Sequence, residues 1–151
     1  MDLFVFVSGY ILGSFAGATV GVLTWLVYGT INPYGFNFPT LIATCIGESL
    51  YGIFGGVLSK SGFGIAKSTA IAEKEFWETN FKMGVVGFLL TFVYDFFTNI
   101  VTGIVFGASL VPYIIAGVPF AIVHEVSNFF FFFFGCSVLI NAIKKTGILG
   151  R

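Results

Sequence analysis

The chain has 151 residues, of which 57% are hydrophobic and only 9% charged, and its formal net charge is zero. Its mean hydropathy is +1.00, and this balance excludes an ordinary water-soluble domain. The few basic residues form no patch of the kind that binds nucleic acid, so we exclude nucleic acid as a partner. The composition predicts an integral membrane protein in contact with the lipid bilayer.

Four apolar segments, at 3–28, 39–58, 83–108 and 110–143, are each long enough to cross the bilayer as a helix, which takes about 20 residues. The alternating segments of about ten residues that indicate barrel strands do not occur. We therefore expect one all-α transmembrane domain over 1–151, a polytopic helical bundle of four to five spans. The fifth span would arise if the last segment divided into two short helices.

The basic residues predict the orientation of the bundle. They are Lys60, Lys67, Lys74 and Lys82 in a connection at about 60–82, and Lys144, Lys145 and Arg151 near the end of the chain. By the positive-inside rule both groups face the cytoplasm. The connection at about 29–39 carries no charge and is rich in turn residues, which predicts an external loop. A multi-pass protein of the cell membrane with both termini in the cytoplasm is expected.

Glycine recurs at every fourth position of the first segment, as Gly9, Gly13, Gly17 and Gly21. This spacing leaves one face of a helix almost bare of side chains, so another helix backbone can approach it closely. The neighbour could belong to the same chain or to a partner, and the sequence leaves both possibilities open.

Three acids lie inside apolar segments, namely Glu48, Asp95 and Glu125, and these segments contain no Lys or Arg that could pair with them. An ionised acid at the middle of a transmembrane helix costs about 2.5 to 3.5 kcal/mol. We therefore expect these side chains to avoid lipid. They should be protonated, hydrogen-bonded to polar neighbours or in contact with a polar cavity.

Two segments carry a polar face at helical spacing. Asp95 and Asn99 lie one turn apart with Tyr94 beside them, and His124 and Asn128 repeat the spacing in the last segment. Two such faces on two helices predict the walls of one binding site. The alternative is a hydrogen-bond network between helices that only fixes their packing.

The run His124-Glu125-x-x-Asn128 resembles the zinc-protease motif His-Glu-x-x-His, but its last position is Asn and the chain has no second histidine. His124 and Asn128 also resemble one element of the intramembrane prenyl-protein proteases, whose paired-glutamate element is missing here. We therefore predict no catalytic residues, no metal site and no cofactor, and we expect that the chain is not an enzyme.

The order of the motifs along residues 3–145 resembles the substrate-binding S components of energy-coupling factor (ECF) vitamin transporters. In chain order the motifs are the Gly9 to Gly21 repeat, Asn32-Pro33-Tyr34-Gly35, Gly47-Glu48-x-x-Tyr51-Gly52, Tyr94-Asp95-x-x-Thr98-Asn99 and His124-x-x-Ser127-Asn128. The Tyr-Asp and His-Ser-Asn helices are the densest parts of the match.

The resemblance implies a membrane subunit that captures a vitamin or a related micronutrient from outside the cell. Such a subunit works with a transmembrane coupling subunit and two cytoplasmic ATPase subunits. By position, the cavity walls would be Glu48, Tyr51, Tyr94, Asp95, Asn99, His124 and Asn128. The loop at 32–38 would be the lid, and the glycine face would slide against the coupling subunit.

S components usually have six helices, and the first commonly carries an Ala-x-x-x-Ala contact for the coupling subunit. Against this pattern the chain is expected to be short at its N-terminus. The leading hypothesis is a solute-binding transport subunit. The alternatives are a small homo-oligomeric channel or scaffold packed through its Gly-x-x-x-Gly face and, third, an intramembrane hydrolase.

Overall fold

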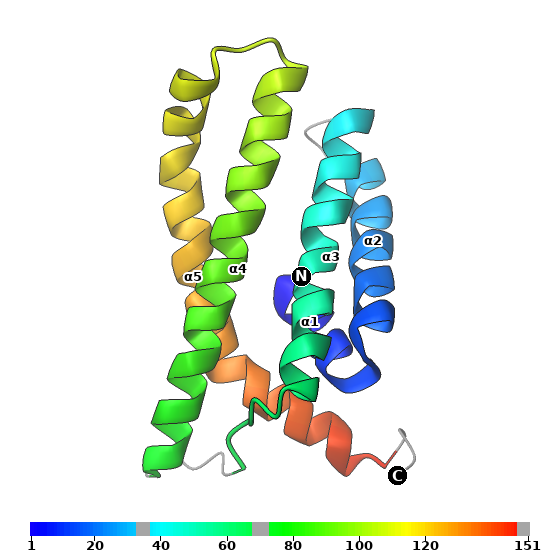
Figure 1. The fold of residues 1–151 in the computed structure, drawn as a ribbon, viewed down its shortest axis with the longest axis vertical. Helices are drawn as coiled ribbons and strands as arrows, with labels where there is room; N and C mark the ends of the chain where they lie inside the picture. The colour runs from blue at the N-terminus through cyan, green and yellow to red at the C-terminus, as the bar shows by residue number, and fades with distance from the viewer. Residues whose placement is uncertain (33–36, 68–72, 148–151) are drawn as a thin grey trace.

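The computed structural model describes residues 1–32, 37–67 and 73–147, which form five α-helices and no strand. The helices are α1 (Asp2–Leu12), α2 (Ser14–Ile31), α3 (Phe38–Lys60), α4 (Lys74–Val105) and α5 (Leu110–Lys145) (Figure 1). Four of them, α2 to α5, are long and apolar enough to cross a membrane. The prediction of an all-α bundle with four to five spans is confirmed.

The first apolar segment is not the single span that we expected over 3–28. Gly13 separates α1 from α2 and has a φ of +96°, a left-handed conformation that glycine adopts without a steric penalty. With 11 residues, α1 is too short to span the bilayer. It descends from the middle of the bundle to its lower end, where the chain turns back into α2 (Figure 1).

The bundle has two antiparallel helix pairs, α2 with α3 and α4 with α5, and α3 also packs against α4 (Figure 1). The short helix α1 lies between them and contacts α2, α3 and α5. The last apolar segment, for which two short helices were possible, is one continuous helix of 36 residues. Its C-terminal part passes below α1 and α3 (Figure 1).

The glycine repeat packs against α3 of the same chain. A Cβ added at Gly9 would lie 1.9 Å from the carbonyl oxygen of Gly52, and one at Gly17 would lie 2.7 Å from the Cα of Gly52. At Gly21 an added Cβ would meet the backbone of Glu48 at 2.8 Å. Gly13 forms the turn instead of joining this face. Gly9, Gly17 and Gly21 therefore bring α1, α2 and α3 into backbone contact.

The lysines gather at one end of the bundle, because α3 and α5 end there and α4 begins there (Figure 1). The connection between α3 and α4 covers 61–73 and is shorter than the expected 60–82, because α4 already begins at Lys74. Lys74 forms an ion pair with Glu78 at 3.1 Å within this helix. The opposite end holds the connection between α2 and α3, but residues 33–36 of the expected lid lie outside the described residues. Which end faces the cytoplasm stays a prediction.

A short segment closes the lysine-rich end. The Tyr10 hydroxyl donates a hydrogen bond to the carbonyl of Phe63 at 2.6 Å, and the Asn141 amide donates to the carbonyl of Ala66 at 2.8 Å. The backbone N–H of Ala66, a fully buried residue, donates to the Ser137 hydroxyl at 3.2 Å. Residues 63–67 are thus fixed to α1 and α5 at this end.

We predict that Gly52→Ala destabilises the protein, because its Cβ would lie 2.1 Å from the backbone carbon of Gly17. Overpacking of this kind costs about 1 to 3 kcal/mol. Thermal unfolding of the purified protein in mild detergent measures the effect as a lower Tm. The matched control is Gly64→Ala, at a position where an added Cβ meets nothing within 4 Å. Equal Tm values for the two variants would contradict this packing.

Candidate functional site

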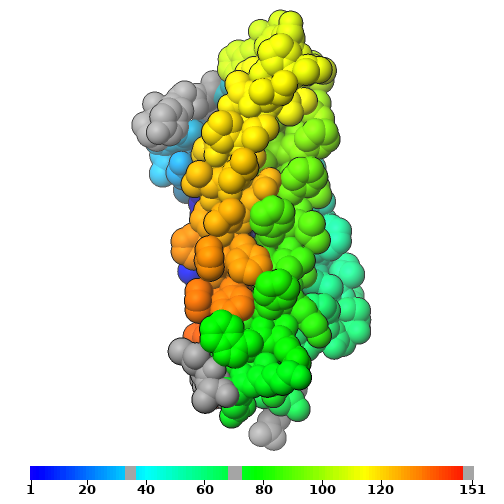
Figure 2. Space-filling view, turned by 90° about the vertical axis from the view of Figure 1, so that its left-hand side faces the viewer, coloured from blue at the N-terminus to red at the C-terminus, as the bar shows by residue number. Residues whose placement is uncertain are grey.

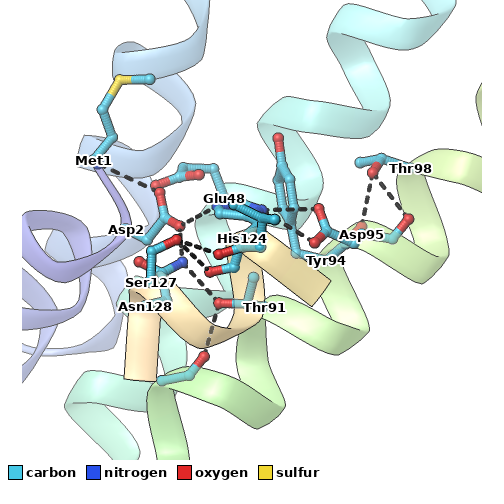
Figure 3. A network of polar contacts seen from close by, with 12 residues as sticks. Met1, Asp2, Glu48, Thr91, Tyr94, Asp95, Thr98, His124, Ser127 and Asn128 are labelled. Atoms are coloured by element: carbon cyan, nitrogen blue, oxygen red, sulfur yellow. Dashed lines mark hydrogen bonds and ion pairs between the residues drawn. The ribbon is translucent and has the colours of Figure 1, made fainter. Parts of the chain in front are cut away.

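A group of polar side chains from all five helices meets about halfway along α3, α4 and α5, and Figure 3 shows most of its members. We call it the polar cluster; it consists of Asp2 of α1, Trp25 of α2, Glu48 and Tyr51 of α3, Thr91, Tyr94 and Asp95 of α4, and His124 and Asn128 of α5. Glu48 lies roughly 18 Å along α3 from Lys60, at 1.5 Å per residue. The cluster is therefore near the middle of a hydrocarbon core of about 30 Å.

His124 lies between two carboxylates (Figure 3). Its Nδ1 is 3.0 and 3.1 Å from the two carboxylate oxygens of Asp95, and its Nε2 is 3.1 Å from an oxygen of Asp2. An ionised carboxylate only accepts hydrogen bonds, so the imidazole donates both bonds when it carries two protons. The resulting charge-assisted bridge joins α1, α4 and α5.

Asn128 connects this bridge to α3 through Thr91. The Asn128 amide donates to a carboxylate oxygen of Asp2 and to the Thr91 hydroxyl, the latter at 2.8 Å. Tyr51, which is fully buried, donates its hydroxyl proton to the same Thr91 oxygen at 2.9 Å. Thr91 in turn donates to the carbonyl of Gly87. Buried polar groups are thus satisfied along this side of the cluster.

Glu48 is the exception. It is only 2% exposed, and one of its carboxylate oxygens, Oε2, accepts a hydrogen bond from the Trp25 indole at 3.2 Å. The other oxygen, Oε1, is buried and has no hydrogen-bond partner among the described residues. A buried polar atom without a partner costs about 1 to 3 kcal/mol, and more when it is charged. The cluster therefore lacks one donor at Glu48.

Four aromatic rings form a row that includes the indole bonded to Glu48; we call it the aromatic wall, and it consists of Tyr28, Trp25, Tyr94 and Tyr51. Successive ring centroids along this wall are 5.2, 6.5 and 6.2 Å apart, and the rings of Trp25 and Tyr94 are nearly parallel, at 26°. The Tyr94 ring lies against Gly47, where an added Cβ would approach it to 2.6 Å. Glycine at position 47 thus makes room for this ring.

Asn99 does not join the polar cluster. Its amide lies against Gly117 of α5, where an added Cβ would be 2.9 Å away. Asn99 instead lines a second pocket of about 360 Å³ between α4 and α5, together with Glu125 and apolar residues, and this pocket borders the cluster at Asp95. Phe92 and Phe96 of this pocket are half exposed at the surface of the bundle. Figure 2 shows the face on which α4 and α5 lie side by side.

The structure thus brings six of the seven predicted site residues into one cluster and separates the seventh, Asn99. Sequence reasoning missed Asp2, Trp25 and Thr91. Thr91 could have been found, because it lies one helical turn before Asp95 and continues its polar face. Asp2 gave little signal, since it precedes the first apolar segment. Within the described ranges, no group of three or more His, Cys, Asp or Glu residues could hold a metal ion.

We predict that Asp95→Asn and His124→Gln each destabilise the protein, because either change leaves a buried charge without one of its partners. The double variant should be only about as unstable as the worse single variant, with a coupling on the order of 1 kcal/mol or more. Unfolding in mixed micelles titrated with a denaturing detergent measures these free energies. A control cycle pairs His124→Gln with Glu78→Gln, a change at the lysine-rich end where Glu78 pairs with Lys74. Additive effects for Asp95 and His124 would refute the bridge.

Comparisons of the chain with protein-family models, curated proteins and solved structures gave no match. The resemblance to ECF S components therefore stays a prediction from the order of the sequence motifs. The chain is a multi-pass, all-helical membrane protein with a buried polar cluster.

Proposed function

We propose that this chain binds a small organic micronutrient inside the membrane and is the substrate-capture subunit of an ECF-type transporter. The observation that carries the proposal is the polar cluster, to which all five helices contribute and in which Glu48 lacks a partner for one oxygen. Ionisable groups at this depth are costly, and proteins retain them mostly where they contact a substrate, an ion or a proton.

The remaining features of the chain fit a subunit that takes its energy from partners. The sequence has no Gly-rich phosphate loop, and the described residues are almost entirely helices of the bundle. We therefore assign ATP hydrolysis to two cytoplasmic ATPase subunits that act through a transmembrane coupling subunit. In the cell membrane, the lysine-rich end would face the cytoplasm, and the solute would enter from the opposite end.

Binding suits the cluster better than catalysis. His124 holds two carboxylates, but a hydrolase of the serine type would also need a nucleophile close to the imidazole. The nearest hydroxyl along α5, that of Ser127, donates to backbone carbonyls of Val123 and His124 in its own helix. We therefore propose that the chain is not an enzyme.

The oligomer hypothesis depended on a free glycine face. Gly9, Gly17 and Gly21 instead contact α3 within the chain. This face is therefore covered within the chain, and we retain the capture subunit as the proposed function.

The proposal predicts that the purified protein binds a small organic micronutrient tightly. Mass spectrometry of material released from the denatured protein would identify what copurifies, and native mass spectrometry would give the stoichiometry. His124→Ala should weaken binding of the identified compound at least tenfold, because it dissolves the bridge between Asp2 and Asp95.

The matched control is Ser127→Ala on the same helix, which removes a hydroxyl bonded only to the backbone of α5. This variant should bind as the unmodified protein does. A folded sample that carries no compound and binds none from a vitamin library would contradict the proposed function. Equal loss of binding in both variants would place the ligand elsewhere in the bundle.

A further inference from the structure

We infer that the solute bound at the polar cluster is an organic cation and that Glu48 is its counter-ion. The inference rests on the proposed function, because it specifies the charge of the same ligand. Three observations carry it: the charge balance of the cluster, the unpartnered oxygen of Glu48 and the aromatic wall beside this carboxylate.

The charges of the cluster do not balance. It contains three carboxylates, those of Asp2, Glu48 and Asp95. The imidazole of His124 pairs with both Asp2 and Asp95 and, when it carries two protons, contributes a single positive charge. No other side chain of the cluster is basic, so negative charge remains in excess and Glu48 has no cationic partner among the described side chains. A positively charged ligand would reduce this excess of negative charge at a depth where a net charge is expensive.

An anionic ligand would find no comparable partner. The lysines of the described residues lie in or near the lysine-rich end of the bundle, and those nearest to the cluster along α3 and α4, Lys60 and Lys82, are about 13 Å from its closest member. The one basic side chain in the cluster, His124, has both ring nitrogens occupied by carboxylates. An anionic ligand would therefore lie near three carboxylates, and no cationic side chain of the cluster would be free to pair with it.

The unpartnered oxygen of Glu48 marks where the positive group would bind. Oε2 is held by the Trp25 indole, so the carboxylate orientation is fixed, and Oε1 remains available for a second donor. A proton on Glu48 would also remove the unpaired charge. Substitution by glutamine distinguishes an ionised Glu48 from a protonated one. Glutamine closely mimics a protonated glutamate but cannot act as a counter-ion, so it should weaken cation binding only if Glu48 is ionised.

The aromatic wall favours an organic cation over a metal ion. Trp25, which bonds Glu48 directly, contacts Tyr28 in an edge-to-face arrangement and lies nearly parallel to Tyr94. The faces of such rings attract ammonium groups and charged heterocycles, with about 0.5 to 2 kcal/mol for each contact. A metal ion would instead require several ligands, and the described residues contain no group of three or more His, Cys, Asp or Glu that could hold one.

The test compares compounds that differ in charge but not in shape. The probes are choline and its neutral tert-butyl isostere, 1-methylnicotinamide and neutral nicotinamide, and a library of vitamins sorted by charge at pH 7. Their binding is measured by thermal shift and calorimetry on the unmodified protein, on Glu48→Gln and on Glu125→Gln. Glu125 is the matched control, because it is a buried acid that lines the second pocket between α4 and α5.

We expect cations to bind better than their neutral partners, and Glu48→Gln to weaken the best cation at least thirtyfold while Glu125→Gln changes it less than threefold. Tyr28→Leu, at a partly exposed position of the aromatic wall, should weaken cations severalfold and provides a second test if Glu48→Gln does not fold. A best ligand that is neutral or anionic, or unchanged affinity in Glu48→Gln, would overturn the inference and leave solute capture intact. Failure of every compound to bind folded protein would count against solute capture itself.

Discussion

The position of His124 between Asp2 and Asp95 is the constraint on which the rest of the polar cluster depends. Lipid offers no hydrogen bonds, so each polar group at this depth must find its partners inside the protein. The imidazole does this for two acids at once, and it thereby fixes the start of α1 against α4 and α5. Asn128 and Thr91 then extend the same network to Tyr51 of α3.

The glycines complete this arrangement from the other side of the bundle. Because Gly17 and Gly21 allow the backbone of α2 to lie directly on α3, the indole of Trp25 reaches the carboxylate of Glu48. Glu48 is thus held both by helix packing and by a hydrogen bond, but its Oε1 has no hydrogen-bond partner among the described residues. Because His124 satisfies both aspartates of the same cluster, we propose that the gap at Glu48 serves ligand binding rather than packing.

Much of the fold could be predicted because hydropathy over about 20 residues identifies a spanning helix whatever its neighbours are. The site was partly predictable, since Asp95 and His124 each lie on a polar helical face. The break at Gly13 was not, because the same repeat of glycines is typical of an unbroken packing face, and only φ distinguishes the two uses. Asp2 and Asn99 depended on how the helices pack, which the sequence alone does not determine.

The most direct test of a solute site at Glu48 is an experimental structure of the protein with its copurifying ligand in a lipid nanodisc. The account predicts ligand density within hydrogen-bonding distance of Glu48 Oε1, beside the rings of Trp25 and Tyr94, with the bridge through His124 intact. Ligand density confined to the pocket between α4 and α5, or a protein group bonded to Glu48 Oε1, would contradict it.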